Sequence, residues 1–197
     1  MTRVVSRIFD SYAQARSAVA ALEEAGFTTA EISLVSRYRD DDTLLDEAAD
    51  RTSATTAGAA AGAILGGGTG LLAALGIIAI PGIGPLVAAG VLATTLTGAA
   101  GGSLVGGLVG ALTGYGISEE DAHVYSEGLR RGGSLVSVTT GDQKASRADA
   151  ILAAHSPVNV DERRQDYRTQ GWSTYDPASK GYTAEEIRRE RERYLRK

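Results

Sequence analysis

The chain has 197 residues, a formal net charge of −4 and no cysteine. This length suits one or two domains with a buried core, while the lack of cysteine excludes disulfides, thiolate nucleophiles and cysteine-ligated metals. A net negative charge gives no general attraction for nucleic acid, and residues 1–10 contain no apolar run that would indicate a secretory signal.

The N-terminal part is predicted to fold as strand, helix and strand. Residues 3–9 are rich in β-branched side chains and end at polar residues, which indicates a strand. Asp10 or Ser11 can cap the helix that follows, and Gly26 is its predicted stop. Residues 31–36 alternate between polar and apolar side chains, which is typical of a second strand.

Residues 52–118 carry no charged side chain, and glycine recurs there at every fourth position. A residue at this interval lines one side of a helix, where glycine lets another backbone approach closely. We therefore assign these glycines to helix packing and self-association, in two ladders. The first ladder consists of Gly58, Gly62, Gly66 and Gly70, and the second of Gly90, Gly98, Gly102, Gly106, Gly110 and Gly114.

The ladders are separated by a predicted hairpin turn, which consists of Pro81, Gly82, Gly84 and Pro85. The segment is thus expected to be a helical hairpin with arms at about 54–79 and about 86–116. Each arm is long enough to cross a hydrocarbon layer of about 30 Å. The flanks are acidic, however, and a composition rich in glycine and alanine makes hydrophobic transfer modest. The segment therefore permits membrane insertion without driving it.

Behind the hairpin the sequence predicts helix, strand, helix and strand. Ser118 is a candidate N-cap for the first helix, which should end at two consecutive glycines. A strand over residues 134–140, a helix over 143–154 and a short fourth strand over 158–161 follow.

The polar tail is predicted to begin as an irregular linker with aromatic anchors and to end in a helix. The helix should open at a capping box formed by Thr183 and Glu186. Its charges alternate in sign, which favours a solvated helix that packs Ile187 and Tyr194 on the body of the protein. A tail that binds a partner or anionic lipid is the alternative.

Without the hairpin and the helix at 118–131, the predicted order is β-α-β-β-α-β, the ferredoxin-like split arrangement of an α+β protein. The hairpin then interrupts this domain between its second and third strands. The predicted parts are residues 1–51, the first half of the domain; 52–117, the glycine-rich helical hairpin; 118–160, the second half; and 161–197, the polar linker and charged C-terminal helix.

Two stretches carry a family pattern: Val5 to Val35, with Arg-Ile-Phe-Asp-Ser-Tyr-Ala-Gln-Ala near its start, and Gly116 to Val136, with His-Val-Tyr-Ser-Glu-Gly-Leu-Arg-Arg-Gly-Gly. Together with Gly171-Trp172 in the tail, they resemble the YflT-like general stress protein domain, also called the 17M-like domain. The resemblance implies a bacterial, non-secreted protein linked to stress induction. The resemblance implies no catalytic residues in this chain.

The residues give little support for an enzyme. His123 and His155 are far apart and belong to no cluster with metal-ligand spacing. Asp40-Asp41-Asp42 lacks the spaced ligands of a calcium loop, and the glycines at 68–73 match a nucleotide motif without its strand or its acid. We therefore expect no enzyme activity, no catalytic, cofactor-binding or metal-binding residues, and no cofactor.

Three functions stay open. The first is a stress-response protein that associates with the membrane through its hairpin. The second is a soluble homo-oligomer whose hairpins form a shared buried core, because a long charge-free stretch would otherwise expose a large apolar patch. The third is a small ligand-binding or enzymatic module. The expected partners are the protein itself and the lipid bilayer, without nucleic acid or a small-molecule substrate, and the expected location is the cytoplasm or the inner face of the cell membrane.

Overall fold

The computed structural model describes residues 2–37, 71, 76–80, 83–100 and 107–195, which form an α+β fold. The strands are β1 (Thr2–Phe9), β2 (Ile32–Ser36), β3 (Gly76–Ile80), β4 (Gly84–Ala89) and β5 (Ser134–Gly141). The helices are α1 (Tyr12–Glu24), α3 (Val91–Ala100), α4 (Gly107–Gly114), α5 (Glu119–Arg130), α6 (Asp142–Ala153), α7 (Val160–Thr169) and α8 (Ala184–Leu195).

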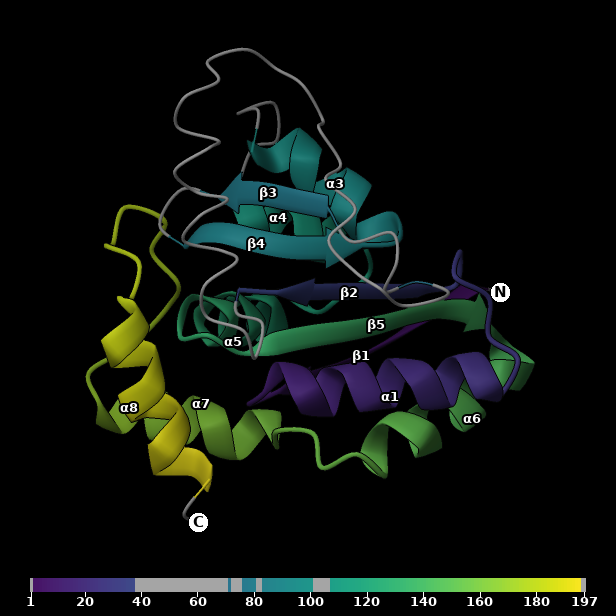
Figure 1. Ribbon diagram of the computed structural model, residues 1–197. Coiled ribbons are helices and arrows are strands. Elements are labelled where there is room, and N and C mark those ends of the chain that lie inside the picture. The colour runs from purple at the N-terminus through teal and green to yellow at the C-terminus, as the bar shows by residue number, and fades with distance from the viewer. Residues whose placement is uncertain (1, 38–70, 72–75, 81–82, 101–106, 196–197) are drawn as a thin grey trace.

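The strands form one antiparallel sheet with the order β1-β5-β2-β4-β3. Figure 1 shows helices on both faces of this sheet, with α7 and α8 together at one end. Residues of α1 and α6 share one hydrophobic core, and residues of α3, α4 and α5 share the core on the other face. Each strand that is buried on both sides therefore contributes alternate residues to two cores.

The predicted strand, helix and strand at the N-terminus are confirmed as β1, α1 and β2. Ser11 caps α1 through a capping box: its hydroxyl accepts from the Gln14 N–H, and the Gln14 side chain accepts from the Ser11 N–H. Gly26 follows the helix with a φ of +85°, a conformation that glycine adopts without strain.

Three of the elements predicted behind the hairpin are also confirmed, as α5, β5 and α6. Ser118 caps α5 by accepting from the Asp121 N–H. β5 lies between β1 and β2 and pairs with both, so that Val138 stands opposite Val5 on one side and Ile32 on the other. Segments that are far apart in the sequence are thus joined in the centre of the sheet.

The chain reverses at the predicted turn, but the turn joins two strands instead of two helices. β3 and β4 pair with Ile80 opposite Gly84, so the reversal falls between these residues as expected. β4 also pairs with β2, which makes the β3–β4 hairpin part of the main sheet. The prediction of helical arms through Ala79 and from Leu86 is therefore wrong at these positions.

Side-chain shape and burial explain why strands form here. The sequence of β3, Gly-Ile-Ile-Ala-Ile, is dominated by β-branched residues, which favour strands over helices. In β4, Leu86 and Ala88 belong to one core, and Val87 and Ala89 belong to the other. A strand buries both faces of this short apolar run, whereas a surface helix would bury only one stripe of it.

After β4, the described part of the expected second arm contains two helices, α3 and α4. Gly90, with a φ of +82°, turns the chain from β4 into α3. The two helices pack against each other, and Leu92, Leu96, Leu108 and Leu112 are buried in the core that they share. Leucines, and not glycines, therefore dominate the described contact between the helices.

The prediction of a fourth strand over residues 158–161 is wrong, because Val160 begins α7. Asn159 caps this helix by accepting from the backbone N–H groups of Asp161 and Glu162. The same two acids lie in the first turn, where negative charge favours the helix dipole. Local capping thus favours a helix over continuation of the sheet.

The predicted C-terminal helix is confirmed as α8, and it packs on the body of the protein. Its capping box forms as expected, because Thr183 and Glu186 exchange side-chain and backbone hydrogen bonds. Ile187 is buried, and the guanidinium carbon of Arg163 lies 3.5 Å from the centre of the Tyr194 ring.

Candidate functional site

The ladder glycines are distributed over several structural contexts. Gly98 lies within α3, Gly110 is half-buried in α4, and Gly84 and Pro85 begin β4. The remaining predicted positions of the ladders and the turn lie outside the described residues, namely Gly58, Gly62, Gly66, Gly70, Pro81, Gly82, Gly102 and Gly106.

Gly90 and Gly114 show that one sequence ladder serves unlike positions. A Cβ added at Gly90 would lie 2.2 Å from the carbonyl oxygen of Ile32, so glycine is required there for close approach of β4 and β2. A Cβ added at Gly114, in contrast, would meet no heavy atom within 4 Å among the described residues. Close backbone packing is thus present at Gly90, but between strands.

The outer edge of β3 is the surface of the charge-free segment that could bind a second chain. β3 is the last strand of the sheet and carries no charged side chain. Unpaired N–H and C=O groups at a sheet edge can pair with another strand, and edges are usually protected by charge, proline or a bulge. β3 contains neither charge nor proline, so we take its outer edge as the candidate site of self-association.

The opposite edge of the sheet, β1, has a different chemistry. It carries Arg3 and Arg7, which are charges of the kind that protect an edge. The chain also crosses its C-terminal end, where the Val158 N–H donates a hydrogen bond of 2.8 Å to the Ile8 carbonyl. Only part of this edge is therefore open.

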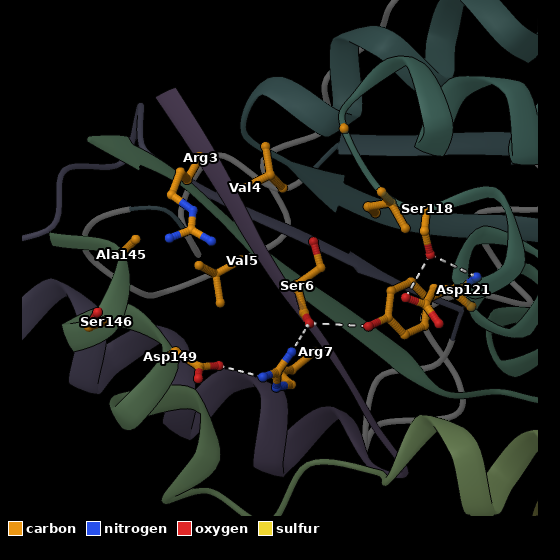
Figure 2. Close-up of a pocket in the computed structure, with 13 residues that line it drawn as sticks. Arg3, Val4, Val5, Ser6, Arg7, Ser118, Asp121, Ala145, Ser146 and Asp149 are labelled. Carbon is orange, nitrogen blue, oxygen red and sulfur yellow. Dashed lines mark hydrogen bonds and ion pairs between the residues drawn. The ribbon is translucent and has the colours of Figure 1, made fainter. Parts of the chain in front are cut away.

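Beside the open part of β1 lies a groove with a volume of about 330 Å³ (Figure 2). Ser118 and Asp121, at the start of α5, line one side, and Ala145 and Ser146 of α6 line the other. The groove is therefore bounded by one helix from each face of the sheet.

The charged groups of the groove are largely paired within the protein. Arg7 forms an ion pair of 2.5 Å with Asp149 and donates to the Ser6 carbonyl at 2.9 Å. The hydroxyl of Tyr125 donates to the same carbonyl at 3.1 Å. Arg3 is the exception, because its side chain is 66% exposed and lies 4.0 Å from Asp142.

Burial raises the pKa of Tyr125 to about 12 from the ordinary value of 10, and the nearby Asp121 carboxylate acts in the same direction. The unfolded chain therefore loses this proton near pH 10, while the folded protein keeps it up to about pH 12. We expect the free energy of unfolding to fall across this window by about 2 kcal/mol on account of Tyr125. Urea unfolding at pH 9 and pH 12 measures the decline.

Tyr125→Phe is the matched variant for this pH dependence. Tyr175 and Tyr167 also have raised pKa values because they are buried, so the parent protein loses stability at high pH for several reasons. The variant should lose about 2 kcal/mol less than the parent between the two pH values. An identical decline in both proteins would contradict the role of Tyr125.

A cluster of buried charges joins the tail to α5, and no local pattern in the sequence indicates it. The Glu127 carboxylate is fully buried and pairs with Arg130 at 2.7 Å and with Arg131 at 2.6 Å. Arg131 reaches across to Glu190 of α8 at 2.6 Å. These four residues contain two acids and two bases, and Glu190 also pairs with the more exposed Arg193 at 3.1 Å.

Aromatic rings enclose this charge cluster. The guanidinium of Arg131 lies 4.1 Å from the centre of the Tyr167 ring, and that of Arg130 lies 5.6 Å from the Tyr182 ring. Trp172 packs edge-on against Tyr167. The cavity beside Arg131 and Glu190 has a volume of only about 20 Å³, which is too small for a substrate. The contacts of the cluster instead hold α7, α8 and the linker on α5.

The two histidines make local contacts. His123 accepts hydrogen bonds from Thr174 and from the Tyr175 N–H, which hold the linker on α5, and His155 donates to the Ile151 carbonyl. The part of the chain that the structure describes contains no group of three or more metal-ligating residues. Within the same part, every helix is too short or too polar to span a bilayer.

The described residues thus define an α+β protein with a charge-free edge on one side of its sheet and a grooved edge on the other. Comparison with known proteins adds no relative. No family model matches the chain, and no curated protein or solved structure matches it.

Proposed function

We propose that this chain is a non-enzymatic stress-response protein that self-associates through its charge-free segment. The observation that carries the proposal is β3, an apolar strand without charge at the end of the sheet. Two copies can pair their β3 strands antiparallel about a two-fold axis. Such an interface is self-complementary, so the assembly is complete as a dimer. The link to stress rests on the resemblance of residues 5–35 and 116–136 to general stress proteins.

The fold proposal is a ferredoxin-like split arrangement that lacks its last strand. It is supported by the order β1, α1 and β2 with β5 between the two strands, followed by α6. The β3–β4 hairpin extends the sheet beyond β2, at the edge opposite to β1. On this proposal the scaffold holds a self-association strand at one edge.

A charged residue at the β3 edge tests the proposal. We expect Ile78→Lys to convert the multimer into a monomer, because a lysine at an edge strand opposes strand pairing. Val91→Lys controls for adding a lysine to the charge-free segment, because Val91 is 45% exposed. Ile78 itself is half-buried against the core, so its variant must be shown to fold. Light scattering after size exclusion, without detergent, gives the mass, and circular dichroism checks that both variants are folded.

The same measurement separates the competing modes of assembly. If β3 pairing is sufficient for assembly, the mass should stay unchanged in Gly102→Leu and in Gly106→Leu. A monomeric mass in these variants would favour assembly through packing of the glycine ladder. If the parent protein is recovered from membranes only after detergent, lipid insertion and not self-association is its mode of assembly. A monomeric parent protein without detergent would contradict the proposal.

A further inference from the structure

The outward-facing backbone groups of β1 form a strand position that the described residues fill only in part. In an antiparallel pair, successive residues direct their N–H and C=O groups alternately toward the partner strand and away from it. The carbonyls of Ile8 and Ser6 accept from Val158 and Tyr125, which lie outside the sheet, so these even-numbered residues face outward. By the same alternation, the N–H and C=O of Val4 and the N–H of Ser6 face outward, and no described residue pairs with them.

Helices border this position on both faces of the sheet. Tyr125 of α5 shares a core with Ile8, whereas Ala148 of α6 shares the other core with Phe9. Figure 2 shows β1 running between these two helices, with the groove of about 330 Å³ beside it. Among the described residues, the backbone donates to this edge at Val158 and then continues into α7.

We infer that this groove binds an extended peptide segment of a partner protein, which adds a strand antiparallel to β1 through Val4 and Ser6. Main-chain hydrogen bonds supply the binding in strand addition, and the walls select the side chains. Gly116, Ala145 and Ser146 are small, so they leave room for side chains of the peptide. The inference concerns a second site, at the opposite edge of the sheet from β3.

The groove is lined by two bases and two acids, so its charge is balanced, and Arg3 is the one group there that we assign to an acidic residue of the peptide. Arg3 is 66% exposed, and its ion pair with Asp142 is long, at 4.0 Å. Its guanidinium is therefore available for a closer carboxylate. Arg7, in contrast, is already paired with Asp149. The acidic side chain is therefore placed near the N-terminal end of β1.

A second folded copy fits this position less well than a peptide. In a β1–β1 pair, α5 and α6 of each copy would face α5 and α6 of the other copy, since both helices border the edge that pairs. A peptide brings no such layers and contacts both walls of the groove. We therefore assign the position to an extended peptide.

The test uses a blocked peptide, acetyl-Thr-Val-Asp-Val-Thr-amide, titrated into the full-length protein and followed by amide NMR. We expect shifts and slower hydrogen exchange at the N–H groups of Val4 and Ser6. The same peptide with its central nitrogen N-methylated should bind about tenfold more weakly, because one main-chain hydrogen bond is lost. No shift at millimolar peptide, or equal affinity of the two peptides, would overturn the inference.

Two protein variants complete the test. Val4→Pro removes one outward N–H but leaves the ladder to β5, because proline is tolerated where an edge N–H faces outward. It should weaken the peptide about tenfold with an unchanged melting temperature. Arg3→Glu should reverse the preference from the aspartate peptide to the matching lysine peptide. Unchanged binding by Val4→Pro, or a drop in its mass that reveals pairing between copies, would contradict the proposed occupant.

Discussion

Gly90→Ala is expected to destabilise the protein by about 3 to 5 kcal/mol, the sum of a left-handed backbone and an overpacked contact. Gly90 has a φ of +82°, and an added Cβ would lie 2.2 Å from the Ile32 carbonyl oxygen and 2.8 Å from the Ser33 Cα. These neighbours are backbone atoms of β2, which cannot move without separating β2 from β4. Chemical unfolding followed by circular dichroism gives the loss of stability.

Gly114→Ala is the matched control, because it belongs to the same sequence ladder. Gly114 lies at the exposed end of α4, and an added Cβ meets nothing described within 4 Å. Alanine should be neutral there or stabilise the helix by up to about 1 kcal/mol. Equal losses in the two variants would support a helical glycine zipper and contradict the strand-to-helix role of Gly90.

Elements with local signals could be predicted from the sequence. Ser11 and Ser118 occupy cap positions, and Gly26 takes the positive φ that ends the first helix. Such signals depend on neighbouring residues only, so they survive in the fold. At Asn159 two signals compete: the capping residue predicts α7, whereas the β-branched residues beside it predict a strand.

The glycine-rich segment shows where periodicity misleads. A spacing of four is compatible with a helix, but it does not determine one when the intervening residues are β-branched and a turn lies close by. The isoleucines of β3 and Val87 beside the turn are the signals that favour a hairpin of strands. Pairing of β4 with β2 then depends on a distant segment, which no local pattern specifies.

The buried charge cluster could not be predicted for a related reason. Arg130 and Arg131 precede two glycines and read as the basic end of a helix, which is ordinary on a surface. Their burial requires Glu190 and the aromatic rings of the tail, which come from a separate part of the chain. Composition gives the charges, but only the fold gives their partners.

Glu127→Gln is expected to lower the free energy of unfolding by about 3 to 5 kcal/mol, because it leaves an uncompensated positive charge among buried groups. Glu127 is fully buried and holds both Arg130 and Arg131, so its loss affects two guanidinium groups at once. Glu185→Gln is the control: its ion pair with Arg189 spans 3.7 Å and is largely exposed, so the change should stay within about 1 kcal/mol.

We expect the loss in Glu127→Gln to come from the uncompensated charge and not from the lost ion pair itself. The double variant Glu127→Gln with Arg130→Met leaves Arg131 and Glu190 as a neutral pair, so it should recover part of the loss. Trp172 is the single tryptophan and packs on Tyr167, beside Arg131, so its fluorescence reports the attachment of the tail. In Glu127→Gln the fluorescence transition should occur at lower urea than the circular dichroism transition, because the tail detaches before the sheet unfolds. Coincident transitions with full parental stability would show that the cluster does not hold the tail in place.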